Sequence, residues 1–438
     1  MSTETTPPFD PLTAAPELET GSRLLEPVSL QPPLQAEGTF AALRFPNYRL
    51  WFYGQLASLV GTWMQTTAQG YLIFQLTHSP AFLGYVGFAS GIPTWLFTLF
   101  GGVISDRMSR RNLLVITQSS MLLLAFILAG LTFAGAVQPW HIILLAFLLG
   151  IANAFDAPAR QSFVLEMVNR DHMANAIALN AAMFNMATAV GPAIAGLAYA
   201  VLGPGWCFTI NGISFFAVIT ALVMMKLAPF TPVTRKTSAV NELREGLRYV
   251  WANQDIRVLI LIIGGSGLLG LSINNLIPAW AVDVLNGDAT TNGLLQAARG
   301  VGSLVAALMI ASFGLRYHRG RMMTLGMFVY PVMMLVFAWA RLVPVSLILM
   351  VGVGWGFMTL SNLCNSMVQH LVKDELRGRV MGVYTLVFFG LVPIGSLILG
   401  WLAQAFSSPA AVAAAGALAL VLAAGVLILA PHIRRLNI

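Results

Sequence analysis

Long apolar stretches alternate with short polar connections along most of the chain. A helix that crosses a bilayer needs roughly 20 mainly apolar residues. Twelve stretches reach that length, near residues 48–75, 80–104, 112–135, 140–163, 173–201, 206–228, 257–283, 289–314, 322–342, 345–370, 376–404 and 408–430. The pattern predicts an all-α membrane protein with twelve transmembrane helices, numbered here in chain order.

One polar connection, residues 229–256, is longer than the others and separates six apolar stretches from six more. Within it the apolar residues share one helical face; they are Leu243, Leu247, Val250 and Trp251. This arrangement is typical of an amphipathic helix at a membrane surface. The sequence therefore predicts two pseudo-symmetric six-helix bundles, over 39–228 and 257–431, joined by a cytoplasmic linker.

The two ends of the chain lie outside these bundles. Residues 1–38 are rich in proline and acidic residues and contain a single cation, Arg23, so we expect a disordered tail. They have neither the basic start nor the apolar core of a cleaved secretory signal. Residues 432–438 form a short C-terminal tail.

Charge and composition agree with a membrane protein. The chain is 57% hydrophobic and 9% charged, whereas soluble domains carry about 25% charged residues. If the N-terminus is cytoplasmic and the helices alternate, every Lys and Arg except Arg299 and Arg341 falls on the cytoplasmic side. We thus expect a multi-pass protein of the cytoplasmic membrane with both termini in the cytoplasm, and the net charge of +7 needs no nucleic-acid partner. Cys207 and Cys364 lie in apolar stretches and are expected to pack, not to bind metal.

The two halves also resemble each other in sequence. At one offset two pairs of glycines align, Gly191 with Gly395 and Gly196 with Gly400. At nearly the same offset a loop motif aligns, Gly102-x3-Asp106-Arg107 with Gly314-x3-His318-Arg319. Parallel repeats of six helices joined by a long connection are typical of secondary transporters.

The loop between predicted helices 2 and 3 carries the most specific motif, Gly102-x3-Asp106-Arg107-x2-Arg110-Arg111. It resembles the loop 2–3 signature of the major facilitator superfamily, and the resemblance covers about residues 40–430. Ser109 stands where that family usually has glycine, and it can cap helix 3. The resemblance implies that Asp106 and the three arginines form a latch that holds one transport state closed. The alternative is a plain basic loop that follows the positive-inside rule.

Candidate partners for this latch lie at nearby helix ends. Arg160, at the end of helix 4, is our first candidate for Asp106, and Arg377 and Arg379 are the alternatives. Asp156 and Arg160 are spaced to pair on one helix face. The second half has a weaker counterpart in its loop 8–9, with His318 in place of the acid; its candidate residues are Gly314, Arg319 and Arg321.

Helix 5 contains Gly191, Pro192 and Gly196 in a pattern that resembles the Gly-Pro signature of facilitator antiporters. The alternative is general close packing through small residues. The segments Ala157 to Val164 and Arg377 to Gly382 are similar to the branch that contains enterobactin exporters and macrolide-type efflux proteins. If the signature holds, the resemblance implies export by antiport.

Polar residues inside the apolar stretches are candidates for a substrate cavity. They are Gln65, Gln69, Asn153, Asn185, Asn274, Asn275, Gln296, Arg299, Asn362 and Asn365. Arg299 either binds an anionic group of the substrate, or extends outward or pairs with Asp283. For proton coupling Asp156 is the first candidate, since burial raises the pKa of a carboxylate. About half of the amides are expected only to join helices.

These features predict a secondary active transporter that exports a small amphipathic drug-like or siderophore-like molecule by alternating access, in exchange for protons. The expected partners are the lipid bilayer, the substrate and the proton, and the protein is expected to be a monomer. The alternatives are a symporter or uniporter that takes up its substrate, a channel, and a membrane-embedded enzyme. We predict no enzyme activity, no cofactor and no metal, because no catalytic cluster exists and Gly352-x-Gly354-x-Gly356 follows no strand.

Overall fold

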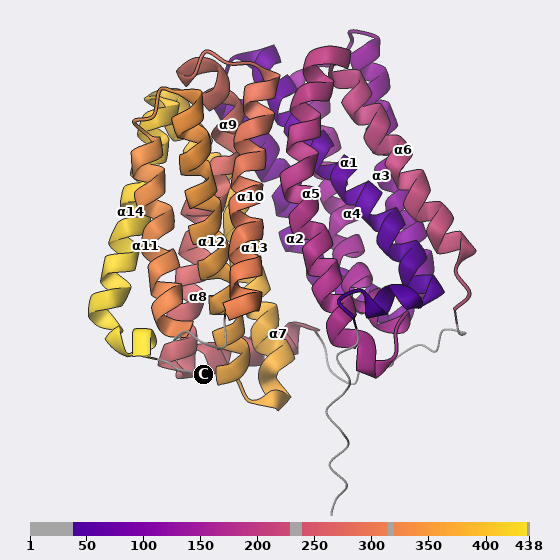
Figure 1. The fold of residues 1–438 in the computed structure, drawn as a ribbon, viewed down its shortest axis with the longest axis vertical. Helices are drawn as coiled ribbons and strands as arrows, with labels where there is room; N and C mark the ends of the chain where they lie inside the picture. The colour runs from indigo at the N-terminus through magenta and orange to yellow at the C-terminus, as the bar shows by residue number, and fades with distance from the viewer. Residues whose placement is uncertain (1–37, 228–238, 314–318, 436–438) are drawn as a thin grey trace, which may run out of the picture. The chain divides into compact units, whose positions relative to one another are not determined.

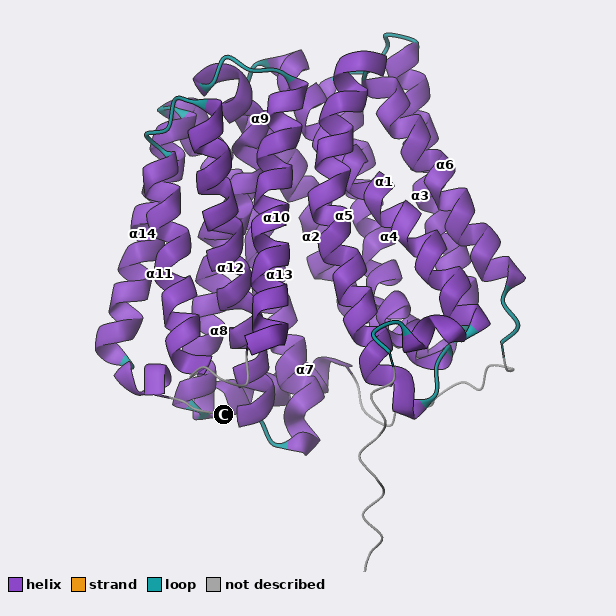
Figure 2. Cartoon of the chain, in the orientation of Figure 1, coloured by secondary structure: helices purple, strands orange, loops and turns teal. Residues whose placement is uncertain are grey.

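The computed structural model describes residues 38–227, 239–313 and 319–435. The chain divides into two compact units, Met1–Thr39 and Phe40–Ile438, and the helices described below belong to the second unit. Within the described ranges every regular element is helical (Figure 2). The described residues leave out 1–37 of the predicted N-terminal tail, 228 at the end of the predicted first bundle, 229–238 of the predicted linker, and 436–438.

The first half of the bundle contains six long helices. They are α1 (Pro46–Thr77), α2 (Pro80–Arg107), α3 (Arg110–Phe133), α4 (Pro139–Phe163), α5 (Met173–Leu202) and α6 (Pro204–Met224). The short 3-10 turns η1 (Ala41–Arg44), η2 (Val164–Glu166) and η3 (Arg170–His172) accompany them. Four of these helices begin at proline, which has the φ of a helix and lacks the N–H that a first turn leaves unbonded.

The second half begins with α7 (Ala239–Ala252) and α8 (Gln254–Ser266). Predicted helix 7 is broken beyond α8 into η4 (Gly267–Leu271), η5 (Ser272–Leu276), α9 (Ile277–Ala279) and η6 (Trp280–Val284), in which η4 and η6 are π-helical and η5 is 3-10. Its glycines and Pro278 account for the break. The remaining helices are α10 (Ala289–Phe313), α11 (Arg319–Phe337), α12 (Val343–Leu371), α13 (Arg377–Ala405) and α14 (Ser408–Leu429), with η7 (Asp374–Leu376) and η8 (Pro431–Arg435).

Ten helical segments among the described residues are long and apolar enough to cross a membrane, and they correspond to predicted helices 3 to 12. Predicted helices 1 and 2 form as α1 and α2, of 32 and 28 residues, but are not among the ten. An all-α, multi-pass membrane protein is therefore confirmed. The count of twelve transmembrane helices stays a prediction.

Each half packs through a similar set of helix pairs. In the first half α2 packs on α4, α1 on α5 and α6, and α3 on α4 and α6. In the second half α10 packs on α12, α11 on α12 and α14, and α13 on the broken helix. Two further pairs, α2 with α13 and α5 with α10, join the halves (Figure 1). We call these two pairs the seams.

The bundle has two ends. The basic end carries the connection Met108–Ser109 together with Arg110, Arg170 and Arg377, and the far end carries Ser79, Gly203 and Leu342 (Figure 1). At the basic end α7 packs on α13, where Arg379 pairs with Glu245, while Trp251 of α7 stays 68% exposed.

Candidate functional site

The connection between α2 and α3 at the basic end shows how the loop motif is built. It consists of Met108 and Ser109, and the Ser109 hydroxyl accepts a hydrogen bond from the Asn112 N–H at 3.3 Å, so Ser109 caps α3. Arg111 donates to the carbonyl of Val223 at 2.8 Å and thereby ties α3 to the end of α6. Arg110 forms an ion pair with Glu166 of η2. Both arginines therefore stabilise contacts within the first half.

The remaining positions of the motif lie on the last turns of α2. Arg107 is exposed, and a Cβ added to Gly102 would meet no atom within 4 Å. The side chain of Asp106 lies outside the described residues, so its pairing with Arg160 stays a prediction.

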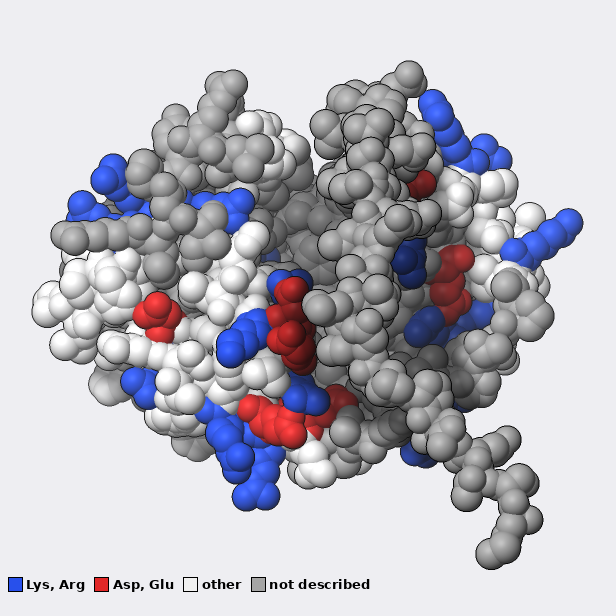
Figure 3. All heavy atoms as spheres, turned by 90° about the horizontal axis from the view of Figure 1, so that it is seen from below, with Lys and Arg blue, Asp and Glu red and all other residues white. Residues whose placement is uncertain are grey.

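The candidate partners in the second half have partners of their own. Arg377 pairs with Asp374 of η7, and Arg379 pairs with Glu245 of α7. In the second loop, Arg319 donates to the Ser366 hydroxyl at 3.3 Å and Arg321 is exposed, while Gly314 lies outside the described residues. Figure 3 looks onto this end of the molecule, where acidic and basic side chains lie side by side. The partners of Arg319, Arg377 and Arg379 thus all lie in the second half.

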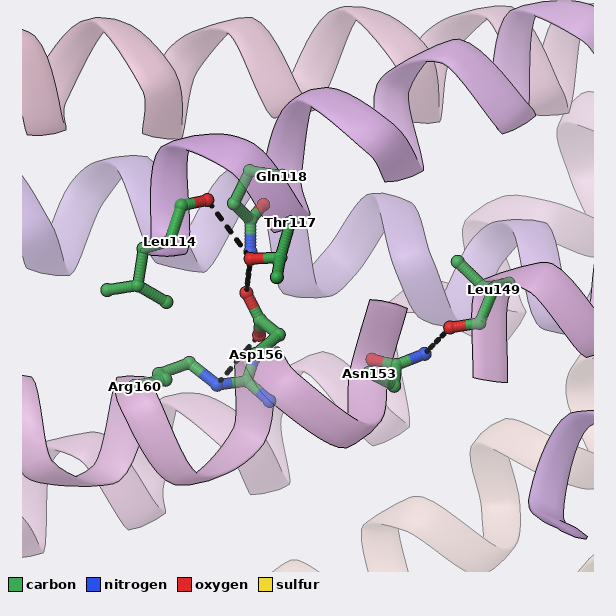
Figure 4. Close-up of polar contacts among 7 residues, drawn as sticks. All are labelled: Leu114, Thr117, Gln118, Leu149, Asn153, Asp156 and Arg160. Atoms are coloured by element: carbon green, nitrogen blue, oxygen red, sulfur yellow. Dashed lines mark hydrogen bonds and ion pairs between the residues drawn. The ribbon is translucent and has the colours of Figure 1, made fainter. Parts of the chain in front are cut away.

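Asp156 forms the most completely built polar cluster (Figure 4). Its side chain is 1% exposed on α4, and its Oδ1 accepts from Gln118 Nε2 at 2.8 Å and lies 2.9 Å from the Thr117 hydroxyl. Its Oδ2 lies 3.6 Å from Arg160 Nε, the predicted pairing of residues four apart. The side-chain oxygen of Gln118 is buried without a hydrogen-bond partner. Donors from α3 and a cation from α4 therefore stabilise a carboxylate inside the bundle.

The helix 5 glycines lie where α5 approaches other helices. A Cβ at Gly191 would lie 2.6 Å from the Trp63 Cβ of α1, and one at Gly196 would lie 3.2 Å from the Gly293 Cα of α10. The aligned glycines of α13 have corresponding neighbours, because Gly395 faces the backbone of η4 and a Cβ at Gly400 would lie 2.8 Å from the Gly84 Cα of α2. Both seams thus close on glycine against glycine.

Several predicted cavity residues form contacts between helices of one half, and their role in a cavity stays a prediction. Gln65 accepts a hydrogen bond from Asn211 at 2.7 Å, Gln69 lies 3.5 Å from the Ile142 carbonyl, and Asn275 donates to Ser396 at 2.6 Å. Others form hydrogen bonds within their own helix. Asn153 donates to the Leu149 carbonyl at 3.1 Å, Asn185 donates to the Ala181 carbonyl at 2.9 Å, and Asn365 accepts from Gln369 at 2.6 Å. Asn362 is half-buried, and the half-buried Asn274 has a shielded oxygen without a partner.

The polar residues of α10 form a single stripe. Asn292, Gln296, Arg299 and Ser303 are spaced by four, three and four residues and so share one helix face. Gln296 receives a hydrogen bond from Thr67 of α1 at 3.2 Å and donates to Asn292 at 3.1 Å. The stripe therefore reaches α1 of the first half at Gln296, whereas the Ser303 hydroxyl lies 3.4 Å from the Gly354 carbonyl of α12. The spacing of Asn292 and Ser303 relative to Gln296 was the signal that sequence reasoning overlooked.

Arg299 lies in the middle of this stripe and of a membrane-spanning helix. It is half-buried, and its Nε is shielded from solvent without a hydrogen-bond partner. Among the described residues no ion pair joins it to Asp283, which is exposed at the far end of the broken helix. A guanidinium in this position can hold an anionic group that approaches along the stripe.

Two packed sets of membrane helices, glycine seams between them and a charged residue at membrane depth define a helical membrane transporter. The chain matches the family described as "Transmembrane secretion effector" over residues 37–437. It belongs to this family of the major facilitator superfamily, in the drug and siderophore efflux branch, and it is a transporter and not an enzyme.

Curated relatives cover most of the chain. The staphyloferrin A transporter of Staphylococcus aureus is 24% identical over 361 residues, which are 82% of this chain and 90% of that protein. The multidrug efflux pump Tap of Mycolicibacterium fortuitum is 27% identical over 366 residues, 81% and 88% of the two chains. The enterobactin exporter EntS of Shigella boydii is 24% identical over 404 residues, 89% and 93% of the two chains.

Solved structures show the same fold. A variant of the nucleoside transporter NupG superposes with a TM-score of 0.74 at 13% identity, covering 90% of this chain and all of that chain. A bacterial homologue of the human lysosomal transporter Spinster, solved in an inward-facing and unoccupied conformation, gives a TM-score of 0.67 at 12% identity and covers 89% and 96% of the two chains.

Proposed function

We propose that this protein exports an amphipathic, anionic small molecule across the cytoplasmic membrane by alternating access, in exchange for protons. The observation that carries the substrate class is Arg299, a cation at membrane depth with a shielded, unpartnered Nε on the polar stripe of α10. Export is supported by the relatives, which are named as multidrug efflux pumps and as an enterobactin exporter.

Alternating access requires two rigid halves that rock against each other. The proposal of twelve transmembrane helices in two symmetric halves is supported by the similar packing pairs of the halves and by the matched glycines of α5 and α13. The positive-inside rule puts the basic end in the cytoplasm. In both seams the contacts of glycine with glycine, Gly196 with Gly293 and Gly84 with Gly400, lie toward the far end, which supports an inward-facing state in this structure.

Substrate recognition in this proposal starts from the cost of burying an arginine. An isolated charge in the membrane is unfavourable unless it is paired or hydrogen-bonded. A carboxylate or catecholate of the substrate would supply that partner to Arg299, and the amide of Gln296 one turn away would add a hydrogen bond. The apolar walls of the neighbouring helices would accept the rest of an amphipathic molecule.

Proton coupling is assigned to Asp156. As a carboxylate it accepts from Gln118 and lies beside Arg160. As a carboxylic acid it could donate its proton to the free oxygen of Gln118 after a rotation of either side chain, so α3 offers a partner to both protonation states. The exchange of partners would loosen the ion pair with Arg160 and so couple protonation to the basic end of α4.

The test uses purified protein in proteoliposomes with an imposed pH gradient. An anionic siderophore, enterobactin, and a cationic macrolide serve as probes. We expect the siderophore to accumulate in vesicles with an acidic lumen, because protons that leave drive the substrate inward. Accumulation only with an alkaline lumen would indicate symport, and equal rates without any gradient would indicate a uniporter or channel.

Two variants separate the parts of the proposal. Asp156→Asn is expected to abolish accumulation driven by the pH gradient but to retain exchange of labelled for unlabelled probe. Arg299→Gln is expected to weaken transport of the siderophore while leaving the macrolide unchanged. If Asp156→Asn still accumulates the probe, the assignment of the proton to Asp156 is wrong, although export itself stands.

A further inference from the structure

Two hollows are lined by α2 and by the far-end turns of α13. One is a polar pocket of about 400 Å³, lined among others by Asp283, Arg341, Gln404 and Ser407. The other is an apolar groove of about 550 Å³, lined by Tyr85, Leu397, Ile398, Trp401, Leu402 and Ala405. Neither belongs to the polar stripe of α10 or to the cluster around Asp156.

Helices α2 and α13 contribute to both hollows, and the pocket is completed by residues of η6, of the connection after α11 and of α14. On α2, Pro80 lines the pocket, and Tyr85, about one and a half turns deeper, lines the groove. On α13, Ala403 and Gln404 line the pocket while Leu402 and Ala405 line the groove. The seam here is closed by a hydrogen bond from the Ser79 hydroxyl to Gln404 Oε1 at 2.6 Å. A ligand that occupied both hollows would thus touch both halves of the protein.

The pocket presents two opposite charges that do not neutralise each other. Arg341 Nη1 donates to the carbonyls of Ala338 and Ala340, each at 3.0 Å, so the guanidinium is fixed at the end of α11. Asp283 comes from the end of η6, and among the described residues no ion pair joins it to Arg341. A fixed cation and a separate, exposed carboxylate complement a zwitterion.

The groove adds the requirement of an apolar chain. Its residues on α13 are spaced along one helix face, and Trp401 is 59% exposed. Tyr85 and Trp401 are the residue types that collect where the bilayer meets water. A ligand that fits both hollows needs a zwitterionic group for the pocket and an apolar chain for the groove. A phospholipid of the membrane has both.

We propose that these hollows bind one phospholipid with an ammonium–phosphate headgroup, of the phosphatidylethanolamine type, from the adjacent leaflet. The phosphate lies at Arg341, the ammonium lies at Asp283, and one acyl chain follows the groove past Ile398 and Trp401. Because the lipid spans the seam between α2 and α13, it stabilises the state in which the far end is closed. This site is independent of the substrate and of the proton coupling proposed above.

The experiment is photolabelling of the full-length protein in nanodiscs. The probe is phosphatidylethanolamine with a diazirine in one acyl chain, and a phosphatidylglycerol probe with the same chain is the comparison. Mass spectrometry maps the labelled peptides. We expect the ethanolamine lipid to label residues 397–405, and Asp283→Asn and Arg341→Gln each to reduce this labelling about tenfold, the loss expected from one charged hydrogen bond.

Matched variants make the result specific. Ile398→Trp fills the groove and should abolish labelling of 397–405, while Ile348→Trp, at a residue of α12 that is 71% exposed, should not change it. Lys373→Gln at the basic end is the charge control. Since Arg341 also holds the end of α11, Arg341→Lys, which keeps the cation, should restore part of the labelling.

Three outcomes would overturn the proposal. The first is equal labelling by both lipids, and the second is unchanged labelling in Asp283→Asn and Arg341→Gln. The third is loss of the label on addition of an exported compound, which would make the hollows an exit path for substrate. Because the readout is binding and not transport, failure here leaves the exporter proposal untouched, and failure of that proposal leaves this one testable.

Discussion

Gly293 is a position at which a single methyl group should force the far end of the α5–α10 seam apart. A Cβ at this residue would lie 2.4 Å from the Pro192 carbonyl oxygen and 2.8 Å from the Gly196 Cα, whereas ordinary van der Waals contact begins at 3.4 Å. Both neighbours are backbone atoms, which cannot turn aside as a side chain can. The helices must therefore separate by roughly 1 Å, the shortfall in the first distance.

Overpacking of this kind costs about 1 to 3 kcal/mol. A tenfold change in an equilibrium corresponds to about 1.4 kcal/mol. The penalty falls only on the state with a closed seam, because the methyl group meets no backbone once α5 and α10 have moved apart. Gly293→Ala should therefore shift the balance toward the state open at the far end by about 5- to 150-fold.

Electron–electron double resonance can measure this shift. Spin labels at Val201 and Leu342, which are 70% and 65% exposed at the far end, report the separation of the two halves, with Cys207 and Cys364 replaced by alanine. We expect a longer distance to gain population in Gly293→Ala. The control is Gly130→Ala, where a Cβ meets no atom within 4 Å. If both variants give the distribution of the parent, the seam glycines do not set the conformational balance.

Three further predictions concern binding and stability. Arg299→Gln should lower the affinity for an anionic probe about tenfold, and Arg299→Lys should keep part of it; binding titrations in detergent would check this, and equal affinities would contradict it. Trp280 is fully buried and stacks on Phe337 with ring centroids 4.3 Å apart. Trp280→Ala should therefore lower the free energy of unfolding by about 3 kcal/mol or more, which thermal unfolding would measure. The control is Trp339→Ala, which changes a residue that is 80% exposed and should have little effect. The backbone N–H of Thr291, at the start of α10, lowers the pKa of the Asp288 carboxyl group. The stabilisation by this carboxylate is therefore present above the unfolded pKa of about 4 and is lost as the pH falls through the lower folded pKa. The difference in melting temperature between the parent and Asp288→Asn should vanish in acid, and a constant difference would refute this.

Much of this protein could be read from contiguous sequence. The apolar stretches located the long helices to within a few residues, since the bilayer requires a helix of a given length and hydrophobicity. The pairing of Asp156 with Arg160 and the capping of α3 by Ser109 were also predictable, because both are contacts within one turn of a helix.

Contacts between helices could not be predicted from the sequence. Gln65 and Asn275 were predicted to line a cavity, but they bond to Asn211 and Ser396 on neighbouring helices of their own halves. Arg379, a predicted latch partner, pairs with Glu245 of α7. No spacing in the sequence reveals such pairs, since each depends on how two helices are rotated and shifted relative to each other.

The sequence by itself determined where helices form, which connections are basic and which residues can meet within one turn. Only the tertiary structure decided that Gly196 faces Gly293, that Gln118 of α3 reaches Asp156, and that Gln296 of α10 meets Thr67 of α1. The physical reason is that hydrophobicity and helical spacing are local properties, whereas the rotation and register of each helix result from all its packing contacts together.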